Sequence, residues 1–517
     1  MIKDYLKDLI LHHFGLKPTA DQSKVIDSLC QFILTPDADS VFILRGFAGT
    51  GKTSLVSALV KTMEQLDREC VLMAPKGRAA KVFSLYSDHP AFTIHKRIYR
   101  QKSIDKDSIF TLNFNMRQNL LFICDEASMI ANEAPLLSPQ GGMSYGTGRL
   151  LDDLVHFVYG GKGCRLILMG DTAQLPPVGD DESPALNDEY MGGYGFNVIS
   201  HTLTEVVRQA DASGILWNAT HLRKELGMWN KECGINTLAT ATRSIPHLPQ
   251  IRFKGFSDVR NISGNELIEV LEECYQRDGE DETIVVTRSN KRANLYNNGI
   301  RARILWREEA LEGGDMLMVA KNNYYWTEKL ALELIANAKA EGKTPEEAET
   351  VPFDFIANGD TAIIKRVRNE RNFYGFTFAD ATLEFPDFEH FGMQVTVLLD
   401  TLQSEAPALT KEQQDTLYNK IMEDYDGDPT LRSKQDKLKA LRQDPYYNAL
   451  QIKYAYAVTC HKAQGGQWTN VFIDQGYMTE ELLSPDYIRW LYTAITRATT
   501  RVFFVNWPKE QVQSVGT

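Results

Sequence analysis

Short apolar runs that end in polar or glycine residues recur along the first part of the chain, and their spacing predicts an α/β domain. Each run is too short for a helix and is flanked by turn residues, which is typical of a buried strand. These runs cover residues 41–44, 69–74, 120–124 and 165–169. Helical spacing of apolar positions between them predicts helices at 16–34 and 54–66.

A second α/β pattern begins near residue 281. The segment TIVVTRSN predicts a strand and a polar loop, and residues 292–305 are expected to be helical. The remaining strands of this half arrive much later in the chain, at 453–459, 470–474 and 501–505. We therefore expect a first domain at 1–205 and a second domain assembled from 206–310 and 451–517.

Residues 311–450 interrupt the second half. Their first part alternates apolar and polar positions around Asn-Gly and Tyr-Gly turns, which predicts a small β-barrel. Their last part, 410–450, is rich in charged residues at helical spacing and predicts a solvated helical insertion. A shorter insertion is expected at 98–118, where alternation around Phe110 and Phe114 and turn residues at 103–108 predict a hairpin.

Composition and charge argue against a membrane-spanning protein, a cysteine metal site and a surface that is basic overall. The 517 residues exceed a single core, and 43% hydrophobic with 24% charged residues is ordinary for a soluble globular protein. No apolar run is long enough to span a membrane, and seven scattered cysteines lack metal-ligand spacing, so a reducing cytoplasm is expected. The net charge of −12 argues against a basic nucleic-acid coat but is compatible with a local basic channel.

A phosphate-binding loop follows the first strand. The segment GFAGTGKT has two glycines, a lysine and a threonine at the spacing of a nucleoside triphosphate loop, between a predicted strand and a predicted helix. Its glycines let backbone N–H groups approach phosphate oxygens, Lys52 neutralises the β/γ-phosphates and Thr53 is expected to ligate Mg²⁺. The expected nucleotide-binding residues are Gly46, Ala48, Gly49, Thr50, Gly51, Lys52, Thr53 and Ser54.

Polar residues at the carboxyl ends of the next strands complete this site. Asp125 can hold Mg²⁺ and Glu126 can orient and deprotonate the attacking water, because both follow a buried strand. Gln174 follows another strand end, where it could sense a γ-phosphate. Gln22, one strand upstream of the loop, has two interpretations: a solvated surface amide, or a contact to the adenine edge.

Seven segments occur in one order along most of the chain: GFAGTGKT, APKGRAAK, DEASM, GDTAQLPPV, EVVRQ, YAYAVTCHKAQGGQW and YTAITRA. Together they resemble the superfamily 1B DNA helicases of the RecD/Dda type. The resemblance implies an α/β fold with two RecA-like P-loop NTPase motor domains, an inserted β-hairpin and an inserted SH3-like β-barrel. It also implies ATP- and Mg²⁺-dependent movement along single-stranded DNA in the 5′-to-3′ direction, and unwinding of duplex-fork DNA.

The resemblance assigns further roles by motif. Arg208 and Arg497 would act as arginine fingers beside Lys52, Glu126 and Gln174, while Gln467 would contact the ribose. The DNA path would be lined by Pro75, Lys76, Gly77, Arg78, Thr93, His95, Lys96, Thr459, His461 and Lys462. Lys76 departs from the family, which has a small hydroxyl residue there.

The hairpin at 98–118 is the candidate for the strand-separating element. Phe110 or Phe114 could present an aromatic face to the first base pair, or both could pack the hairpin onto the core. Two rival functions remain open: an RNA or RNA–DNA hybrid helicase on the same scaffold, and an ATP-dependent switch that binds nucleic acid without translocating. No membrane partner is expected, and a monomer is compatible with the sequence.

Overall fold

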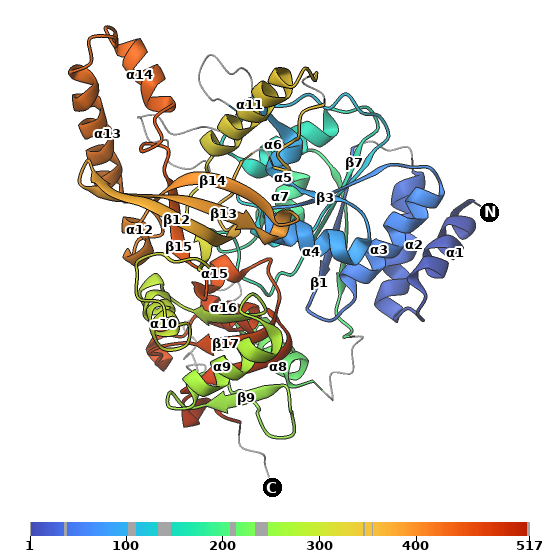
Figure 1. Ribbon diagram of the computed structural model, residues 1–517. Helices are drawn as coiled ribbons and strands as arrows, with labels where there is room; N and C mark the ends of the chain where they lie inside the picture. The colour runs from blue at the N-terminus through green and yellow to red at the C-terminus, as the bar shows by residue number, and fades with distance from the viewer. Residues whose placement is uncertain are drawn as a thin grey trace.

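The computed structural model describes residues 2–35, 39–101, 110–132, 146–206, 213–232, 247–344, 347–353 and 355–513. It contains two parallel sheets, a closed barrel and a two-stranded hairpin (Figure 1). The fold class expected from the sequence, α/β with two motor domains and two insertions, is confirmed. None of the helices within these described ranges is long and apolar enough to cross a membrane.

The first sheet is parallel and places the predicted strand ends along one edge. Its order is β3-β2-β6-β7-β1-β8, and every neighbouring pair runs in the same direction. The strands are β1 (Ser40–Gly46), β2 (Cys70–Ala74), β3 (Ala91–Thr93), β6 (Leu121–Cys124), β7 (Arg165–Gly170) and β8 (Asn197–Leu203). Because β1, β6 and β7 are adjacent, the polar segments that follow them meet.

Helices pack around this sheet. The longer ones are α1 (Ile2–Phe14), α2 (Ala20–Leu34), α3 (Lys52–Gln65), α4 (Gly77–Ser87) and α6 (Leu150–Tyr159); α5 (Ile94–Ile98) and α7 (Asp188–Gly192) are short, and η1 (Ala127–Met129) and η2 (Pro184–Leu186) are single 3₁₀ turns. Thr19 caps α2 and forms a capping box with Gln22. This box fixes where α2 begins, immediately beside the phosphate-binding loop.

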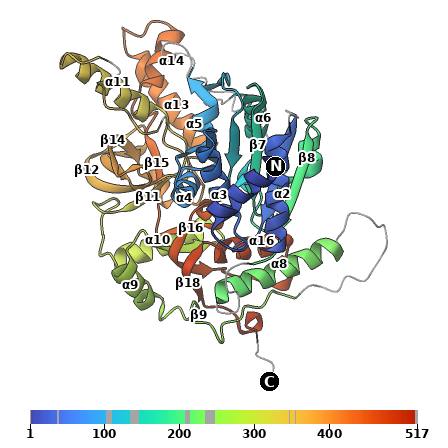
Figure 2. The same ribbon diagram turned by 90° about the vertical axis from the view of Figure 1, so that its right-hand side faces the viewer.

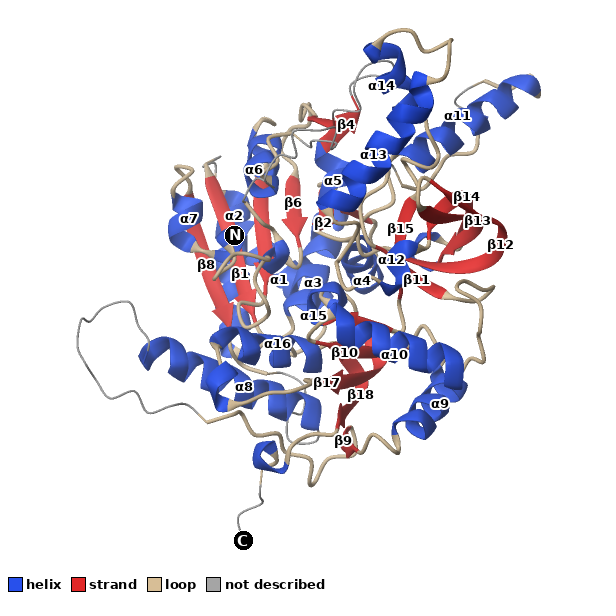
Figure 3. Cartoon of the chain, turned by 90° about the vertical axis from the view of Figure 1, so that its left-hand side faces the viewer, coloured by secondary structure: helices blue, strands red, loops and turns tan. Residues whose placement is uncertain are grey.

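The second sheet has the order β16-β10-β17-β18-β9 and is also parallel. Its strands are β9 (Val259–Ile262), β10 (Thr283–Thr287), β16 (Ala457–Thr459), β17 (Trp468–Asp474) and β18 (Ala498–Val505). The helices of this domain are α8 (Gly214–Glu232), α9 (Leu267–Asp278), α10 (Asn290–Arg303), α15 (Cys460–Ala463) and α16 (Pro485–Ile495). Two 3₁₀ turns, η5 (Glu480–Leu482) and η6 (Lys509–Gln511), also belong to it. Helix α16 is buried at every position from Tyr487 to Ile495. Together with α15 it lies where the two sheets approach each other (Figures 2 and 3).

The predicted barrel is present and is closed by five strands. They are β11 (Met316–Val319), β12 (Thr361–Phe373), β13 (Phe376–Phe385), β14 (Phe391–Leu398) and β15 (Leu450–Tyr454). The predicted Tyr-Gly turn joins β12 to β13, with positive φ at Tyr374 and Gly375. Helix α11 (Tyr325–Ala340), the short α12 (Asp400–Gln403) and the 3₁₀ turn η4 (Pro386–Phe388) belong to the same insertion.

The prediction of one strand at 453–459 is wrong. Leu450–Tyr454 forms β15 and pairs with β11 and β14 in the barrel, whereas Ala457–Thr459 forms β16 and pairs with β10. The second sheet therefore resumes at Ala457 rather than at residue 451. Residues 450–458 are buried without interruption, so hydropathy carries no sign of the change from one sheet to the other.

The two smaller insertions match their predictions in type. Strands β4 (Tyr99–Gln101) and β5 (Phe110–Leu112) form an antiparallel hairpin. Helices α13 (Lys411–Asp426) and α14 (Lys434–Arg442) form the predicted helical insertion, which projects from the barrel in Figure 1. Leu417, Ile421 and Leu441 of these helices pack against Phe376 and Phe378 of β13, so one face is buried rather than solvated.

Candidate functional site

The loop between β1 and α3 adopts a conformation that its glycines allow. Gly49 and Gly51 have φ of 77° and 82°, in the left-handed region. A Cβ at Gly46 would lie 2.8 Å from Cγ of Lys52, so only glycine lets the lysine side chain fold back over the loop. Lys52 Nζ donates to the carbonyl oxygens of Gly46 at 2.6 Å and Phe47 at 3.2 Å. The Lys52 ammonium group is thus held against the backbone of the loop itself.

The first turn of α3 also faces this loop. Gly51 caps the helix without a side-chain hydrogen bond. Backbone N–H groups at such a helix start, together with the helix dipole, attract anions. Thr53 and Ser54 from this turn line the same cavity as Gly49 and Lys52. Chain geometry therefore brings the predicted phosphate-binding residues together.

The acidic pair Asp125–Glu126 faces the lysine across the cavity. Asp125 is partly buried, and burial together with the adjacent Glu126 raises its pKa to about 7. Its Oδ1 accepts the Glu126 N–H at 2.8 Å. Glu126 itself has a φ of 52°, a left-handed conformation that is uncommon outside glycine and that concentrates at functional sites.

A cavity of about 680 Å³ lies between the two motor domains and contains these groups. This volume is in the range of small-molecule sites. The first motor contributes the phosphate-binding loop, Asp125, Glu126 and Gln174, and the second contributes Gly465, Gln467 and residues 496–499. Residues that are about 300 positions or more apart in the sequence thus share one cleft.

Gln22 is buried, so its interpretation as a solvated surface amide is wrong. Its side chain is 1% exposed. Oε1 accepts the Thr19 N–H and Nε2 donates to the Thr50 carbonyl, each at 3.0 Å. The amide joins the start of α2 to the phosphate-binding loop and borders the cavity. A contact to adenine stays a prediction.

Arg497 lies in the cleft but is held by its own domain. It is 3% exposed. Its guanidinium donates to the carbonyls of Thr493 and Gly466, both at 3.1 Å, and to Thr496 Oγ1 at 3.3 Å. These neutral acceptors leave its charge available to an anion in the cavity. Arg208, the other predicted finger, lies outside the described residues.

The loop after β7 makes contacts that sequence reasoning missed. Asp171 accepts the Ala173 N–H at 2.9 Å and the Tyr492 hydroxyl at 2.5 Å. Burial raises the pKa of Asp171, and that of Tyr492 lies well above its usual value for the same reason. The Tyr492 oxygen also accepts the Ala48 N–H at 2.9 Å. Both residues lie inside recognised motifs, but no sequence pattern shows that they meet.

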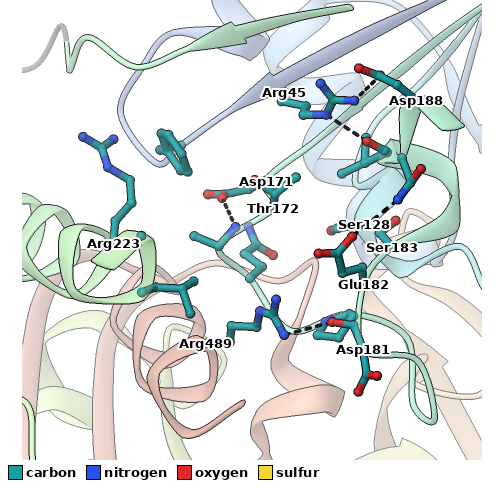
Figure 4. Close-up of a pocket in the computed structure, with 18 of the residues that line it drawn as sticks. Arg45, Ser128, Asp171, Thr172, Asp181, Glu182, Ser183, Asp188, Arg223 and Arg489 are labelled. Atoms are coloured by element: carbon teal, nitrogen blue, oxygen red, sulfur yellow. Dashed lines mark hydrogen bonds and ion pairs between the residues drawn. The ribbon is translucent and has the colours of Figure 1, made fainter. Parts of the chain in front are cut away.

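A second cavity, of about 510 Å³, lies behind the loop that carries Asp171 and Gln174 (Figure 4). Arg489 of α16 borders it and donates to the Asp181 carbonyl at 2.9 Å. Arg45 donates to the Leu186 carbonyl at 2.8 Å and pairs with Asp188. Residues of both motors therefore border this cavity.

Several predicted DNA-path residues gather where the domains meet. Lys76 Nζ donates to the His461 carbonyl at 3.0 Å. Burial and the neighbouring Lys462 lower the pKa of Lys76 to about 8, and burial lowers that of Lys462 to about 8. The Lys462 Nζ atom is buried and has no hydrogen-bond partner within the described residues. Thr459 immediately precedes α15, which carries His461 and Lys462.

Arg78 and Gly77 serve contacts between domains. The Arg78 guanidinium lies 4.2 Å from the centre of the Trp468 ring and donates to the Gln467 carbonyl at 3.3 Å. A Cβ at Gly77 would lie 2.8 Å from Oδ1 of Asp360, so glycine permits the barrel to approach α4. Pro75 is partly buried just before this segment.

The predicted residues on α5 contact the segment before the barrel strand β12. Thr93 caps α5 by accepting the Lys96 N–H, and Lys96 Nζ donates to the Pro352 carbonyl at 2.6 Å. The His95 ring packs against Phe355, and burial lowers the pKa of His95 to about 4. Burial therefore favours the neutral form of the His95 imidazole.

Of the two candidate wedge residues, the structure describes the side chain of Phe114 but not that of Phe110. Phe114 is 73% exposed, with the Arg100 guanidinium 5.5 Å from its ring centre. The interpretation in which Phe114 packs the hairpin onto the core is therefore wrong. Phe110 pairs with Gln101 in the hairpin backbone, and its side chain lies outside the described parts.

Two family models match the chain. Residues 19–136 match an AAA domain and residues 454–505 match the UvrD-like helicase C-terminal domain. The first covers the phosphate-binding loop and the acidic pair, and the second covers Lys462, Tyr492 and Arg497.

Curated relatives are distant. An uncharacterised protein of Acanthamoeba polyphaga mimivirus is 24% identical over 94% of this chain and 99% of its own length. An uncharacterised protein of Methanocaldococcus jannaschii is also 24% identical over 94% of this chain, which spans only 38% of that protein. The ATP-dependent RecD2 DNA helicase of Deinococcus radiodurans is 28% identical over 31% of this chain and 18% of its own.

Solved Pif1 helicase structures align along the chain with low scores. The helicase from Candida albicans gives a TM-score of 0.42 at 13% identity, over 97% of both chains. The one from Bacteroides, in complex with ADP-AlF3 and single-stranded DNA, gives 0.38 at 14% identity, over 97% of this chain and 95% of that one. The assignment therefore relies on the two matched domains and the cleft they build: this chain is an ATP-hydrolysing helicase, and its motifs resemble those of superfamily 1B.

Proposed function

We propose that this protein is an ATP-dependent DNA helicase that translocates 5′-to-3′ on single-stranded DNA and unwinds duplex. The observation that carries the proposal is the cleft itself. Lys52, Asp125 and Glu126 of one motor border the same cavity as Arg497 of the other. A triphosphate in this cavity would contact both motors, so its hydrolysis would change how the motors are held together.

The chemistry assigns one role to each side chain. Lys52 and the α3 N-terminus bind the β/γ-phosphates, and Glu126 orients and deprotonates the attacking water. Arg497, with Arg208, stabilises charge on the transferred phosphoryl group, and Gln174 senses the γ-phosphate.

Mg²⁺ fits the oxygen donors at this position. Thr53 and Asp125 both border the cavity, and the charged form of the Asp125 carboxylate, which burial disfavours, would be favoured by a cation. When bound, the ion would supply charge neutralisation on the phosphates. Thr53 and Asp125 are the residues that would hold it.

Single-stranded DNA is the proposed partner because of the groups at the domain junction. Lys76 and Lys462 place two ammonium groups from different motors near each other, and Lys462 Nζ is buried with no hydrogen-bond partner in the described part of the chain. A backbone phosphate would satisfy both without reading sequence. Pro75, Gly77, Arg78, Thr93, His95, Lys96, Thr459 and His461 are proposed to shape this path, and Gln467 and Gln22 to contact the ribose and adenine. The Deinococcus relative supports DNA as the substrate by its name.

ATPase stimulation tests this proposal. Wild-type turnover is expected to rise with single-stranded DNA and much less with RNA of equal length. Lys52→Ala is expected to abolish turnover, and Glu126→Gln to retain ATP binding while turnover stalls. Near wild-type, DNA-stimulated turnover in either variant would show that the site is misassigned, and equal stimulation by RNA would contradict a DNA substrate.

A further inference from the structure

Side chains of the second motor hold one residue of the first motor by both of its backbone groups. The Leu175 N–H donates to Thr493 Oγ1 at 3.0 Å. Gln464 Nε2 donates to the Leu175 carbonyl at 2.9 Å and lies 3.4 Å from Gln174 Oε1. Thr493, Gln464 and Leu175 are each less than 5% exposed. Water therefore does not replace these bonds while the interface is closed.

Leu175 adjoins the proposed γ-phosphate sensor. Gln174 precedes it directly and borders the nucleotide cavity. Any shift of this loop in response to the nucleotide must either carry Thr493 and Gln464 with it or leave buried backbone groups without partners. The positions of the Thr493 and Gln464 side chains thus depend on the position of the loop that carries Gln174.

Thr493 connects the loop to the arginine finger. It lies one helical turn before Arg497, and Arg497 Nε donates to the Thr493 carbonyl at 3.1 Å. Its hydroxyl holds the sensor loop while its carbonyl holds the finger. Displacement of the loop would therefore shift the Arg497 guanidinium through Thr493.

Gln464 connects the same loop to the DNA path. It follows helix α15, which carries His461 and Lys462. Its own N–H donates to the Cys460 carbonyl at 3.0 Å, so it is fixed to this short helix. A movement of Leu175 would therefore reach the groups proposed to contact DNA.

We infer that Thr493 and Gln464 are positioning residues that couple DNA binding to ATP turnover through the backbone of Leu175. This inference rests on the proposed function, because it assigns a regulation to the same cleft. Neither side chain need touch nucleotide or DNA. Thr493 connects Leu175 to the arginine finger Arg497, and Gln464 connects Leu175 to the residues proposed to contact DNA.

Paired variants of each residue test the coupling. Thr493→Val keeps the shape but removes the acceptor for the Leu175 N–H, and Thr493→Ser keeps the hydroxyl as its matched control. Gln464→Met keeps the length but removes the donor to the Leu175 carbonyl. ATPase rates would be measured over a range of ATP concentrations, with and without saturating oligo-dT. Oligo-dT affinity would be measured in parallel.

We expect the ratio of DNA-stimulated to unstimulated kcat to fall about tenfold in Thr493→Val and Gln464→Met, within the usual range of coupling between sites. KM for ATP and oligo-dT affinity should stay within about twofold of wild type, and Thr493→Ser should keep the wild-type ratio. A purely structural role would lower stimulated and unstimulated rates alike and leave the ratio unchanged. If Thr493→Val does not fold, Gln464→Met carries the same test from the other backbone group.

An unchanged ratio in Gln464→Met, or an equal fall in Thr493→Ser and Thr493→Val, would overturn the inference. These results leave the proposed function standing as long as the wild-type protein is stimulated by oligo-dT. A wild-type protein without stimulation would instead overturn the proposed function, and the inference with it.

Discussion

The Tyr492 hydroxyl donates to the Asp171 carboxylate at 2.5 Å, and the two residues belong to different motor domains. The same hydroxyl accepts the N–H of Ala48 in the phosphate-binding loop. One buried oxygen therefore joins helix α16, which ends two residues before Arg497, to two strand ends of the first motor. By bridging the two motors next to Ala48 and Asp171, which border the nucleotide cavity, this oxygen aligns them.

Removing this oxygen should impair turnover. In Tyr492→Phe we expect kcat with DNA to fall roughly ten- to hundredfold, because small misplacements of catalytic groups have effects of this size. Tyr487→Phe is the matched control, since that hydroxyl lies on the same helix but contacts Gln475 and Gln511. Both variants should lower the thermal midpoint, as each loses buried hydrogen bonds. Equal kcat in the two variants would contradict the alignment role.

Arg497→Ala should lower kcat by roughly a thousandfold or more, the scale of an arginine finger. The loss of affinity for ATP should be much smaller, because Arg497 is held by carbonyls of its own domain and we propose that it reaches the phosphate only on closure. Steady-state kinetics and fluorescent-nucleotide binding separate the two effects. Arg303→Ala on α10, outside the cleft, is the control. Equal losses in binding and rate would identify Arg497 as a ground-state clamp instead.

Phe114 is a wedge candidate with an exposed ring. Phe114→Ala should lose duplex unwinding while DNA-stimulated ATPase and translocation are retained, since separating a base pair costs about 1–2 kcal/mol of stacking that an aromatic face can return. Met116→Ala, at an 87% exposed residue nearby, is the control. Phe110→Ala, measured alongside, tests the other candidate. A joint loss of both activities, or no loss, would rule out the wedge.

The pKa of about 8 for Lys76 and Lys462 predicts how DNA affinity depends on pH. Both ammonium groups lose their protons as the pH rises through 8, so oligo-dT affinity should fall between about pH 7 and pH 9, well below the ordinary lysine range. Lys462→Arg keeps a fixed charge and should flatten this fall, whereas Lys339→Arg on the exposed part of α11 should not. Parallel pH profiles in all three proteins would show that Lys462 does not contact DNA.

Local features of the site were predictable from sequence, and contacts between distant segments were not. The loop that holds Lys52 follows from glycine, lysine and strand spacing within a dozen residues. The contact of Tyr492 with Asp171 joins residues 321 positions apart, and nothing in either neighbourhood encodes it. The strand break near residue 455 was missed because both sheets bury this stretch. The side-chain bonds of Gln22 depended on packing that hydropathy does not describe.

The direct test of the account is unwinding of partial duplexes that carry a single-stranded tail on either the 5′ or the 3′ side. Wild-type protein should unwind the 5′-tailed substrate when ATP and Mg²⁺ are present, and Lys52→Ala should unwind neither. Wild-type protein should unwind little of the 3′-tailed substrate. Faster unwinding of the 3′-tailed substrate would contradict the proposed polarity, and ATP hydrolysis without unwinding of either substrate would contradict the helicase assignment.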